Sequence, residues 1–546
     1  MNNIKLLTQA NILLKQCKYD DAEKIYLDLL VKTPDDPIIQ AFLGRLYIRK
    51  RKYKSAERIL QKSYDKRKTS ASVSALAFCK FKLRKFDDAV ILYEELFEYD
   101  KNSPKIYNRI IDAFRELQMY DFEVAYAQKF YDKHPELDNA MVRLTQAYLD
   151  KGDVKMAESF CAKTIQKFPK CPEIWIVAGS LQEFLYCNEE LAQECYITAI
   201  DNGGIIGYYH LGVSYIKTGQ FDKAENALKK IIQLLPNDNY PKSALGTLYL
   251  TQKKLKEGYE LFFTREKSTE IDTLKNLWNG TEQKDKTLLL YCDQGLGDHL
   301  QFIRYLPFCE DKFKKIKVLT RKPCLDLFKR VYKYDNVIFY DKLSDIKEYD
   351  YYVLASDLPY YLNIDFDNVP YANGYLTANK DKVEYFKQKY FNNNKLKIGL
   401  CWKAGGIGIR GAINRTVNID YFKKMLELSD SKQIQFYSVQ LEDIFDGCKK
   451  YPQIINLESE IQDFEDTAAI IENCDIFITV DTSCAHLAGA IGKQTFVMLP
   501  YCADWRWFNQ SHSTEWYSSI ELFKQQDRQD WFIEVDEMIK RISDKI

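Results

Sequence analysis

The chain has 546 residues, of which 46% are hydrophobic and 29% charged, and its 78 basic side chains balance its 78 acidic ones. This composition excludes a wholly disordered, collagen-like or disulfide-stapled protein, and the length predicts three or four domains of roughly 150 residues. Zero net charge also removes the basic excess typical of a dedicated nucleic-acid-binding protein, so no nucleic-acid partner is expected.

Cysteine, histidine and apolar runs indicate the class of protein. The 14 cysteines contain no Cys-x-x-Cys pair and the five histidines lie far apart, so no local segment has the spacing of a zinc site. Unpaired cysteines favour a reducing compartment. The amino-terminal segment lacks the features of a secretory signal, and no run of about 18 apolar residues could span a membrane. We therefore expect a soluble, cytoplasmic protein without a membrane span.

The first half of the chain is repetitive. A marker position, small in most repeats, recurs every 32 to 35 residues, at 22, 56, 89, 123, 157, 192, 224 and 258. The repeat that shows the pattern best reads Tyr208-x2-Leu211-Gly212-x2-Tyr215, then Ala224 and Pro236. This pattern resembles the tetratricopeptide repeat (TPR) family, in which a small residue lets two antiparallel helices approach closely and proline ends the second helix. The resemblance predicts an α superhelix of about eight hairpins over residues 1–267, with Glu123 and Gly258 as departures at the marker.

Stacked hairpins leave a concave groove, and such grooves usually hold a peptide or another protein. We therefore expect the TPR groove to recruit a protein acceptor, with a purely structural array as the alternative. The many Tyr and Phe side chains at helical spacing are interpreted as core rather than as ligand contacts.

Beyond a polar connector, residues 268–285, strand-like apolar runs alternate with amphipathic helices. The runs cover residues 287–292, 316–320, 350–354, 396–402, 434–439, 475–480 and 494–499. The alternation predicts two α/β domains, each a doubly wound parallel sheet, over residues 286–391 and 395–546. In such sheets, ligands bind beyond the carboxyl ends of the strands.

The first polar segment after a strand is Asp293-Gln294-Gly295-Leu296-Gly297-Asp298-His299. Its glycines allow a sharp turn, and Asp298 falls at the start of a helix. One interpretation makes Asp298 a helix cap that contributes about 1 kcal/mol. The other makes it a cleft carboxylate that serves as a general base.

The second segment, Gly399-Leu400-Cys401-Trp402-Lys403, runs into the glycine-rich Ala404-Gly405-Gly406-Ile407-Gly408. Arg410 and Arg415-Thr416 follow. Cations beside glycine-rich backbone suit a diphosphate. The alternative is an ordinary solvated loop, which fits Arg410 well.

The third segment is the buried run 475–480, the polar turn Asp481-Thr482-Ser483 and a small-residue helix that contains His486 and closes at Gly492. Free amides and hydroxyls at that helix N-terminus form an anion site. His486 either adds a donor there or is a packed, hydrogen-bonded residue.

Together, these segments resemble the heptosyltransferase-like bacterial glycosyltransferases of the two-domain GT-B type. The run Gln294 to Asp298 with Gln301-Phe302 and Arg304-Tyr305-Leu306-Pro307 looks like that family's amino-terminal motif. Asp481-Thr482-Ser483 with His486-Leu487-Ala488 looks like its donor-site motif. Asp504-Trp505-Arg506-Trp507, followed by Trp516-Tyr517, is similar to a subgroup with TPR repeats before the transferase, including enzymes that glycosylate flagellin. O-GlcNAc transferases share the layout but are more distant.

The resemblance implies roles for individual residues. Asp298 would take the proton from an acceptor hydroxyl, and Lys403 would neutralise the departing diphosphate of a nucleotide-sugar donor. Arg506 would shape the donor pocket, or be stacked between tryptophans as part of the structure. The residues expected to bind the donor are Gln294, Gly295, Gly297, Lys403, Arg415, Thr416, Gln440, Asp481, Thr482, Ser483, His486 and Arg506.

No metal is expected, and no cofactor besides the nucleotide-sugar co-substrate. The Asp365-Phe366-Asp367 sequence is interpreted as a turn rather than a metal clamp. His299 either shares the base role or fills the first helical turn, and we favour the second interpretation.

The leading hypothesis is an inverting glycosyltransferase that moves a sugar from a nucleotide-sugar donor to a hydroxyl of a protein held by the TPR groove, such as flagellin. One alternative keeps the enzyme but changes the acceptor to a lipid-linked or polysaccharide glycan. Another is a non-catalytic TPR scaffold with a degenerate transferase domain. The sugar, nucleotide and acceptor depend on the shape of the pocket, which is not readable from the sequence.

Overall fold

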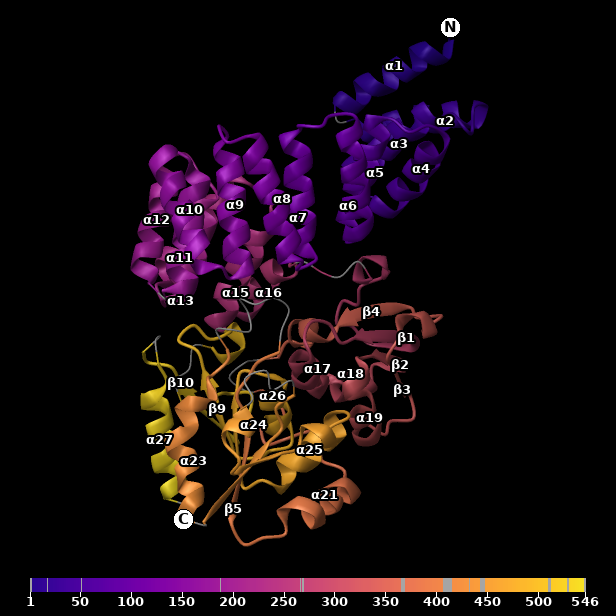
Figure 1. The fold of residues 1–546 in the computed structure, drawn as a ribbon. Helices are drawn as coiled ribbons and strands as arrows, with labels where there is room; N and C mark the ends of the chain where they lie inside the picture. Colours follow the sequence, from indigo (N-terminus) through magenta and orange to yellow (C-terminus); the bar gives the residue numbers. More distant parts are fainter. Residues whose placement is uncertain are drawn as a thin grey trace. The chain divides into compact units, whose positions relative to one another are not determined.

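The computed structural model describes residues 2–16, 18–50, 52–186, 188–265, 267, 270–364, 369–405, 415–431, 433–441, 447–508, 512–527 and 530–544. The chain divides into two compact units, Met1–Gly207 and Tyr208–Ile546. Figure 1 follows the chain from the helices of the first unit to the strands of the second.

The first unit consists of antiparallel helices in which consecutive helices pack against each other. Its helices are α1 (Asn2–Lys15), α2 (Tyr19–Lys32), α3 (Pro37–Arg49), α4 (Tyr53–Lys66), α5 (Ser70–Lys82), α6 (Phe86–Glu95), α7 (Pro104–Glu116), α8 (Tyr120–Lys133), α9 (Asp138–Lys151), α10 (Val154–Lys167), α11 (Pro172–Leu185) and α12 (Glu189–Asp201). The predicted superhelix of hairpins is confirmed in this half of the chain.

Small residues hold each hairpin together. The marker residues Ala22, Ala56 and Ala89 are completely buried. At Gly44 on α3, an added Cβ would lie 2.4 Å from the Leu60 side chain of α4, so only glycine permits this approach of the two helices. The period therefore has the physical cause that the sequence suggested: close contact between the two helices of a hairpin.

Glu123 departs from the small-residue rule at the marker. Its side chain is completely buried on α8, and its Oε1 lies 2.7 Å from the Arg115 guanidinium, which also pairs with Asp150 at 2.8 Å. Burial raises the pKa of Glu123 to about 7, against the opposing charge of Arg115. A buried charge needs such a partner, and here Arg115 of the preceding helix supplies it.

The second unit begins with further hairpin helices and continues into two α/β domains. The hairpin helices are α13 (Gly207–Lys217), α14 (Phe221–Leu234), α15 (Asn239–Thr251) and α16 (Leu255–Phe262). The helices of the α/β domains are α17 (Leu296–Phe302), α18 (Pro307–Glu310), α19 (Lys322–Val331), α20 (Leu358–Tyr361), α21 (Lys380–Phe386), α23 (Lys423–Leu426), α24 (Gly447–Lys450), α25 (Phe464–Asn473), α26 (Ser483–Ala490) and α27 (Phe532–Ser543). The hairpin helices thus end at Phe262, whereas the second compact unit already starts at Tyr208.

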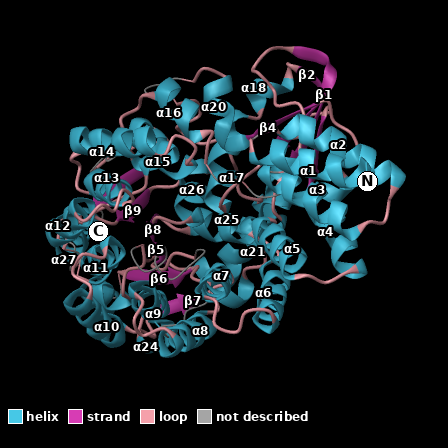
Figure 2. Cartoon of the chain, turned by 90° about the horizontal axis from the view of Figure 1, so that it is seen from above, coloured by secondary structure: helices cyan, strands magenta, loops and turns pink. Residues whose placement is uncertain are grey.

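Two parallel sheets form the α/β part. The first has the order β3-β2-β1-β4 and the second β10-β9-β8-β5-β6-β7. Their strands are β1 (Gln283–Tyr291), β2 (Phe313–Leu319), β3 (Val337–Tyr340), β4 (Tyr351–Leu354), β5 (Leu396–Cys401), β6 (Ile434–Ser438), β7 (Ile454–Asn456), β8 (Ile476–Val480), β9 (Thr495–Leu499) and β10 (Ile520–Lys524). Figure 2 shows β5, β6 and β7 of the second sheet side by side in magenta. The predicted α/β class is confirmed. Among the described strands, the prediction missed β3, β7 and β10, which lie at the edges of the sheets.

The strand order reverses once in each sheet. In the first sheet the chain moves from β1 to β2 and β3, and then returns to the other side of β1 as β4. In the second sheet, β5, β6 and β7 run one way and β8, β9 and β10 the other. Because ligands bind beyond the carboxyl ends of strands at such reversals, two places are indicated: the ends of β1 and β4, and those of β5 and β8.

Candidate active site

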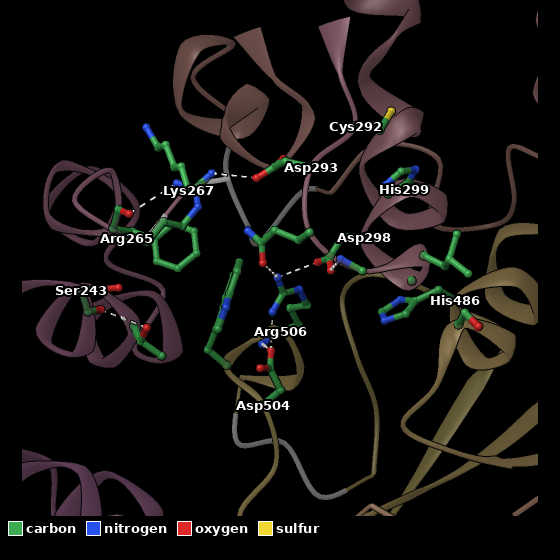
Figure 3. Close-up of a pocket in the computed structure, with 18 of the residues that line it drawn as sticks. Ser243, Arg265, Lys267, Cys292, Asp293, Asp298, His299, His486, Asp504 and Arg506 are labelled. Carbon is green, nitrogen blue, oxygen red and sulfur yellow. Dashed lines mark hydrogen bonds and ion pairs between the residues drawn. The ribbon is translucent and has the colours of Figure 1, made fainter. Parts of the chain in front are cut away.

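A cavity of about 1870 Å³ lies at the ends of β1, β5 and β8 in the second unit. Segments that follow β1, β2, β3, β5, β8 and β9 line it, together with side chains of α13 and α15. Figure 3 shows Asp298, His486 and Arg506 among the residues that line it. The cavity brings together the following residues expected from the sequence: Gln294, Gly295, Gly297, Asp298, Arg415, Asp481, Thr482, Ser483, His486 and Arg506.

Asp298 lies in the first turn of α17. Its Oδ2 accepts a hydrogen bond of 3.0 Å from the Gly295 amide, and its Oδ1 lies 2.6 Å from Nη2 of Arg506. Burial raises the pKa of Asp298; the Arg506 charge opposes this, and the charges of Asp293 and Asp504 add to it. Asp298 is therefore part of the cap of α17 and also a carboxylate of the cavity, while its role as a general base stays a prediction.

Arg506 is the cation nearest to that carboxylate. It lies in the short helix η11 (Trp505–Trp507), stacks on the Trp505 ring at 4.7 Å and pairs with Asp504 at 2.8 Å. Its Nη2 also donates to Oε1 of Gln294 at 3.2 Å. Arg506 thus stacks on a tryptophan and also lines the cavity, two features that the sequence left as alternatives.

His486 packs directly against the turn that carries Asp298. A Cβ added at Gly297 would lie 2.8 Å from Cδ2 of His486, so the second glycine of the motif leaves room for this ring. The ring stacks on Trp507 at 5.4 Å, and its Nδ1 lies 3.0 Å from the Tyr517 hydroxyl. Burial, with the charges of Arg506 and Arg304, lowers the pKa of His486 to about 3, so the ring is neutral at physiological pH.

The polar turn after β8 is the segment for which the sequence predicts an anion site. Thr482 precedes α26, and the free amides of the first helical turn carry the positive end of the helix dipole. Arg415 donates to the Asp481 carbonyl at 3.3 Å, and its guanidinium lies 3.9 Å from the Asp481 carboxylate. Burial raises the pKa of that carboxylate to about 6, with Arg415 opposing. A phosphate at this place would meet an arginine and helix amides together.

Three residues expected at the donor have other contacts. Oε1 of Gln440 accepts from the Trp402 and Lys403 amides at 3.2 and 2.8 Å, and Oγ1 of Thr416 accepts from the Ala404 amide at 3.3 Å. Among the described residues, Lys403, Thr416 and Gln440 are not part of the cavity lining. Gln440 and Thr416 thus order the backbone after β5 and do not face the cavity. Arg410 and the glycines Gly406 and Gly408 lie outside the described residues, as does Asp365-Phe366-Asp367.

His299 also lines the cavity, and its contacts are those of a packed residue. Its ring is 1% exposed, and its Nδ1 lies 2.9 Å from Oγ1 of Thr320 and 3.4 Å from the Arg321 amide. Burial, together with the charge of Arg321, lowers the pKa of His299 to about 4. This side chain packs α17 onto the end of β2 and leaves the carboxylate of Asp298 to other partners.

Sequence reasoning missed an ion cluster at the end of β1 and β4. The Arg265 guanidinium, just after α16, lies 3.1 Å from Asp293 and 2.7 Å from Asp357 and donates to Oγ of Ser356 at 2.8 Å. All three charged side chains are at most 8% exposed. Asp293 directly follows β1 and could have been suspected; Arg265 gave no local signal.

Within the described part of the chain, no group of three or more His, Cys, Asp or Glu side chains is arranged to hold a metal ion. No described helix combines the length and apolar character needed to cross a bilayer.

Comparison with known proteins identifies the repeats. Residues 7–71 and 205–238 match family models described as tetratricopeptide repeat. Protein FlbA of Caulobacter vibrioides is 23% identical over 317 residues, which cover 51% of this chain and 51% of FlbA. The chain therefore spans about half the length of this curated relative.

The chain is also similar in part to solved structures. Yeast Tom70 is 18% identical over 45% of this chain and 54% of its own, with a TM-score of 0.37. A tetratricopeptide repeat protein from Parabacteroides merdae is 14% identical over 44% of this chain and 97% of its own, with a TM-score of 0.39.

Proposed function

We propose that this chain is an inverting glycosyltransferase of the GT-B type that transfers a sugar from a nucleotide-sugar donor to a hydroxyl group of a protein. The observation that carries the proposal is the placement of Asp298 in one cavity with Arg415, Arg506 and the N-terminus of α26. Transfer from a nucleotide sugar needs a base for the acceptor hydroxyl and positive groups for the leaving phosphate. The cavity offers both.

In this proposal the donor's phosphates bind at the start of α26. The amides after Thr482 and the Arg415 guanidinium accept the negative charge, and the hydroxyl of Ser483 adds a donor. As the bond to the sugar breaks, charge collects on the leaving phosphate, and Arg506 and His486 stabilise it. Preformed donors of this kind act strongly because they need no reorganisation during the reaction.

Asp298 acts on the other reactant. The acceptor hydroxyl gives its proton to the carboxylate while its oxygen attacks the anomeric carbon from the face opposite the leaving phosphate, so the configuration inverts. The transition state resembles an oxocarbenium ion. The raised pKa of Asp298 suits the task, because a stronger base accepts the proton more readily.

The acceptor would reach the carboxylate along the wall formed by the last repeats. Tyr209 of α13 and Ser243 and Thr247 of α15 line the same cavity as Asp298. TPR helices commonly bind polypeptides, which supports a protein acceptor. Flagellin, the acceptor of enzymes that the sequence resembles, is the first one to test.

The test is release of nucleotide from a panel of sugar nucleotides, with and without candidate acceptor proteins. We expect one donor to be consumed, faster when acceptor is present. Consumption that needs a lipid-linked or polysaccharide glycan instead would replace the protein acceptor. Absence of turnover with every donor and acceptor would contradict the proposal and favour the scaffold alternative.

A further inference from the structure

The His486 ring is held on three sides by residues that leave it little freedom. Trp507 stacks on its face, with 17° between the two ring planes, and Gly297 touches its edge. The Tyr517 hydroxyl lies 3.0 Å from Nδ1. Gly489 makes this possible, because an added Cβ there would come within 2.4 Å of the Tyr517 ring. The contact between the histidine and the tyrosine is therefore built into the small-residue pattern of α26.

Which atom carries the hydrogen between these two residues follows from their neighbours. Arg304, which is completely buried, donates from Nη2 to the Tyr375 hydroxyl at 3.2 Å, and that hydroxyl donates its own hydrogen to the Leu300 carbonyl at 2.7 Å. Arg304 also lies over the Tyr517 ring, with 4.7 Å from its guanidinium carbon to the ring centroid. The Tyr375 hydrogen is therefore already used, and the completely buried Tyr517 hydroxyl has one hydrogen of its own to donate.

Among the described residues, Nδ1 of His486 is the hydrogen-bond partner of the Tyr517 hydroxyl. If Nδ1 carried the N–H, the hydrogen of this buried hydroxyl would be left without an acceptor, which is costly. The hydrogen therefore goes to Nδ1. In a neutral ring, one nitrogen accepts and the other is the donor, so Nε2 carries the N–H.

The surroundings also keep the ring uncharged. Burial and the charges of Arg506, Arg304 and Arg415 disfavour the imidazolium, while the charge of Asp504 favours it. Asp298 and Asp481 line the same cavity, but Arg506 and Arg415 respectively pair with them. The histidine is therefore neutral, and the hydrogen bond from Tyr517 determines which of its two nitrogens carries the hydrogen.

We propose that Tyr517 is a positioning residue that fixes His486 as the neutral Nε2–H tautomer, so that the ring presents a hydrogen-bond donor to the cavity, where the leaving phosphate would accept it. The tautomer itself is independent of any reaction. Its use as a donor to phosphate rests on the proposed function.

The first experiment is NMR of protein labelled with ¹⁵N-histidine, because the nitrogen shifts distinguish the two tautomers and the cation. The chain has five histidines, and His486→Gln assigns the signal. We expect a neutral Nε2–H signal from pH 5 to 8, which changes toward a mixture of tautomers in Tyr517→Phe. A signal of the Nδ1–H form or of the cation, or an unchanged tautomer in Tyr517→Phe, would overturn the proposal whether or not the protein has activity.

The second experiment tests the use of the donor. We expect Tyr517→Phe to lower kcat about tenfold, the effect of roughly one hydrogen bond, with little change in donor KM and with an unchanged circular dichroism spectrum. His486→Gln should keep more activity than His486→Ala, because the Gln amide can also donate. Tyr437→Phe is the matched control: it also removes a buried hydroxyl, one bonded to Asn393 and the Tyr390 carbonyl, and it lies away from the cavity. Equal losses in both tyrosine variants would contradict the role of Tyr517.

Discussion

The charged side chains at the ends of β1 and β4 differ in burial and pairing from those at the ends of β5 and β8. At β1 and β4, the charges of Arg265, Asp293 and Asp357 neutralise one another and are at most 8% exposed. At β5 and β8, Arg415 is 34% exposed, and the turn after β8 offers amides and hydroxyls. The charges of the first edge are thus satisfied by one another, whereas the second edge leaves an arginine and helix amides at the cavity, which bind the donor in the proposed function. Changes at the first edge should therefore alter kcat or stability, and changes at the second should alter donor binding.

The largest effect is expected at Asp298. Asp298→Asn keeps a side-chain oxygen that accepts from the Gly295 amide, so the helix cap and the fold persist while the base is lost. We expect kcat to fall by about 10² to 10⁴, with donor affinity nearly unchanged, as measured by nucleotide release and calorimetry. Asp326→Asn, on the exposed face of α19, is the control. Equal turnover in the two variants would remove Asp298 as the base.

Arg265→Gln tests the first edge. It leaves Asp293 and Asp357 buried side by side without their shared cation, and we expect a loss of about 3 to 5 kcal/mol in the free energy of unfolding, measured by urea denaturation. Adding Asp357→Asn should recover part of this loss, because the double variant buries one charge fewer. A loss below about 1 kcal/mol for Arg265→Gln would show that the cluster does not stabilise this edge.

Arg415→Gln tests the second edge. The variant removes the cation that pairs with Asp481 beside the start of α26. We expect donor KM to rise about tenfold, the value of one charge-assisted hydrogen bond, with kcat reduced less. Steady-state kinetics at saturating acceptor measure both constants. A fall in kcat alone would reverse the assignment of the two edges.

The smallest effect concerns pH. The Asp504 charge raises the pKa of Asp298, and the base works only when deprotonated. Asp504→Asn should therefore lower that pKa and move the acid limb of kcat/KM to lower pH, by less than about one pH unit. The pH profile of both proteins measures this. A shift to higher pH would mean that Asp504 acts mainly by holding Arg506 close to Asp298, where the cation lowers that pKa.

The sequence predicted much of the fold because its causes are local. The repeat period follows from small residues such as Ala22, and the apolar runs predicted the central strands. Glu123 could not be understood alone, because its partner Arg115 lies on the preceding helix. Likewise, the rule for strand ends grouped Asp298 with His486, but the ion pair of Asp298 with Arg506 and the contact of His486 with Tyr517 join segments far apart in the chain. Gln440 and Thr416 were expected at the donor because they are polar residues near strand ends, but their side chains accept hydrogen bonds from backbone amides after β5.

The most direct test of glycosyl transfer is the intact mass of an acceptor protein after incubation with a sugar nucleotide and either the wild-type chain or Asp298→Asn. The account predicts an acceptor heavier by one or more sugar residues with the wild type and an unchanged mass with the variant. Modification by both proteins, or by neither across the donor panel, would contradict it.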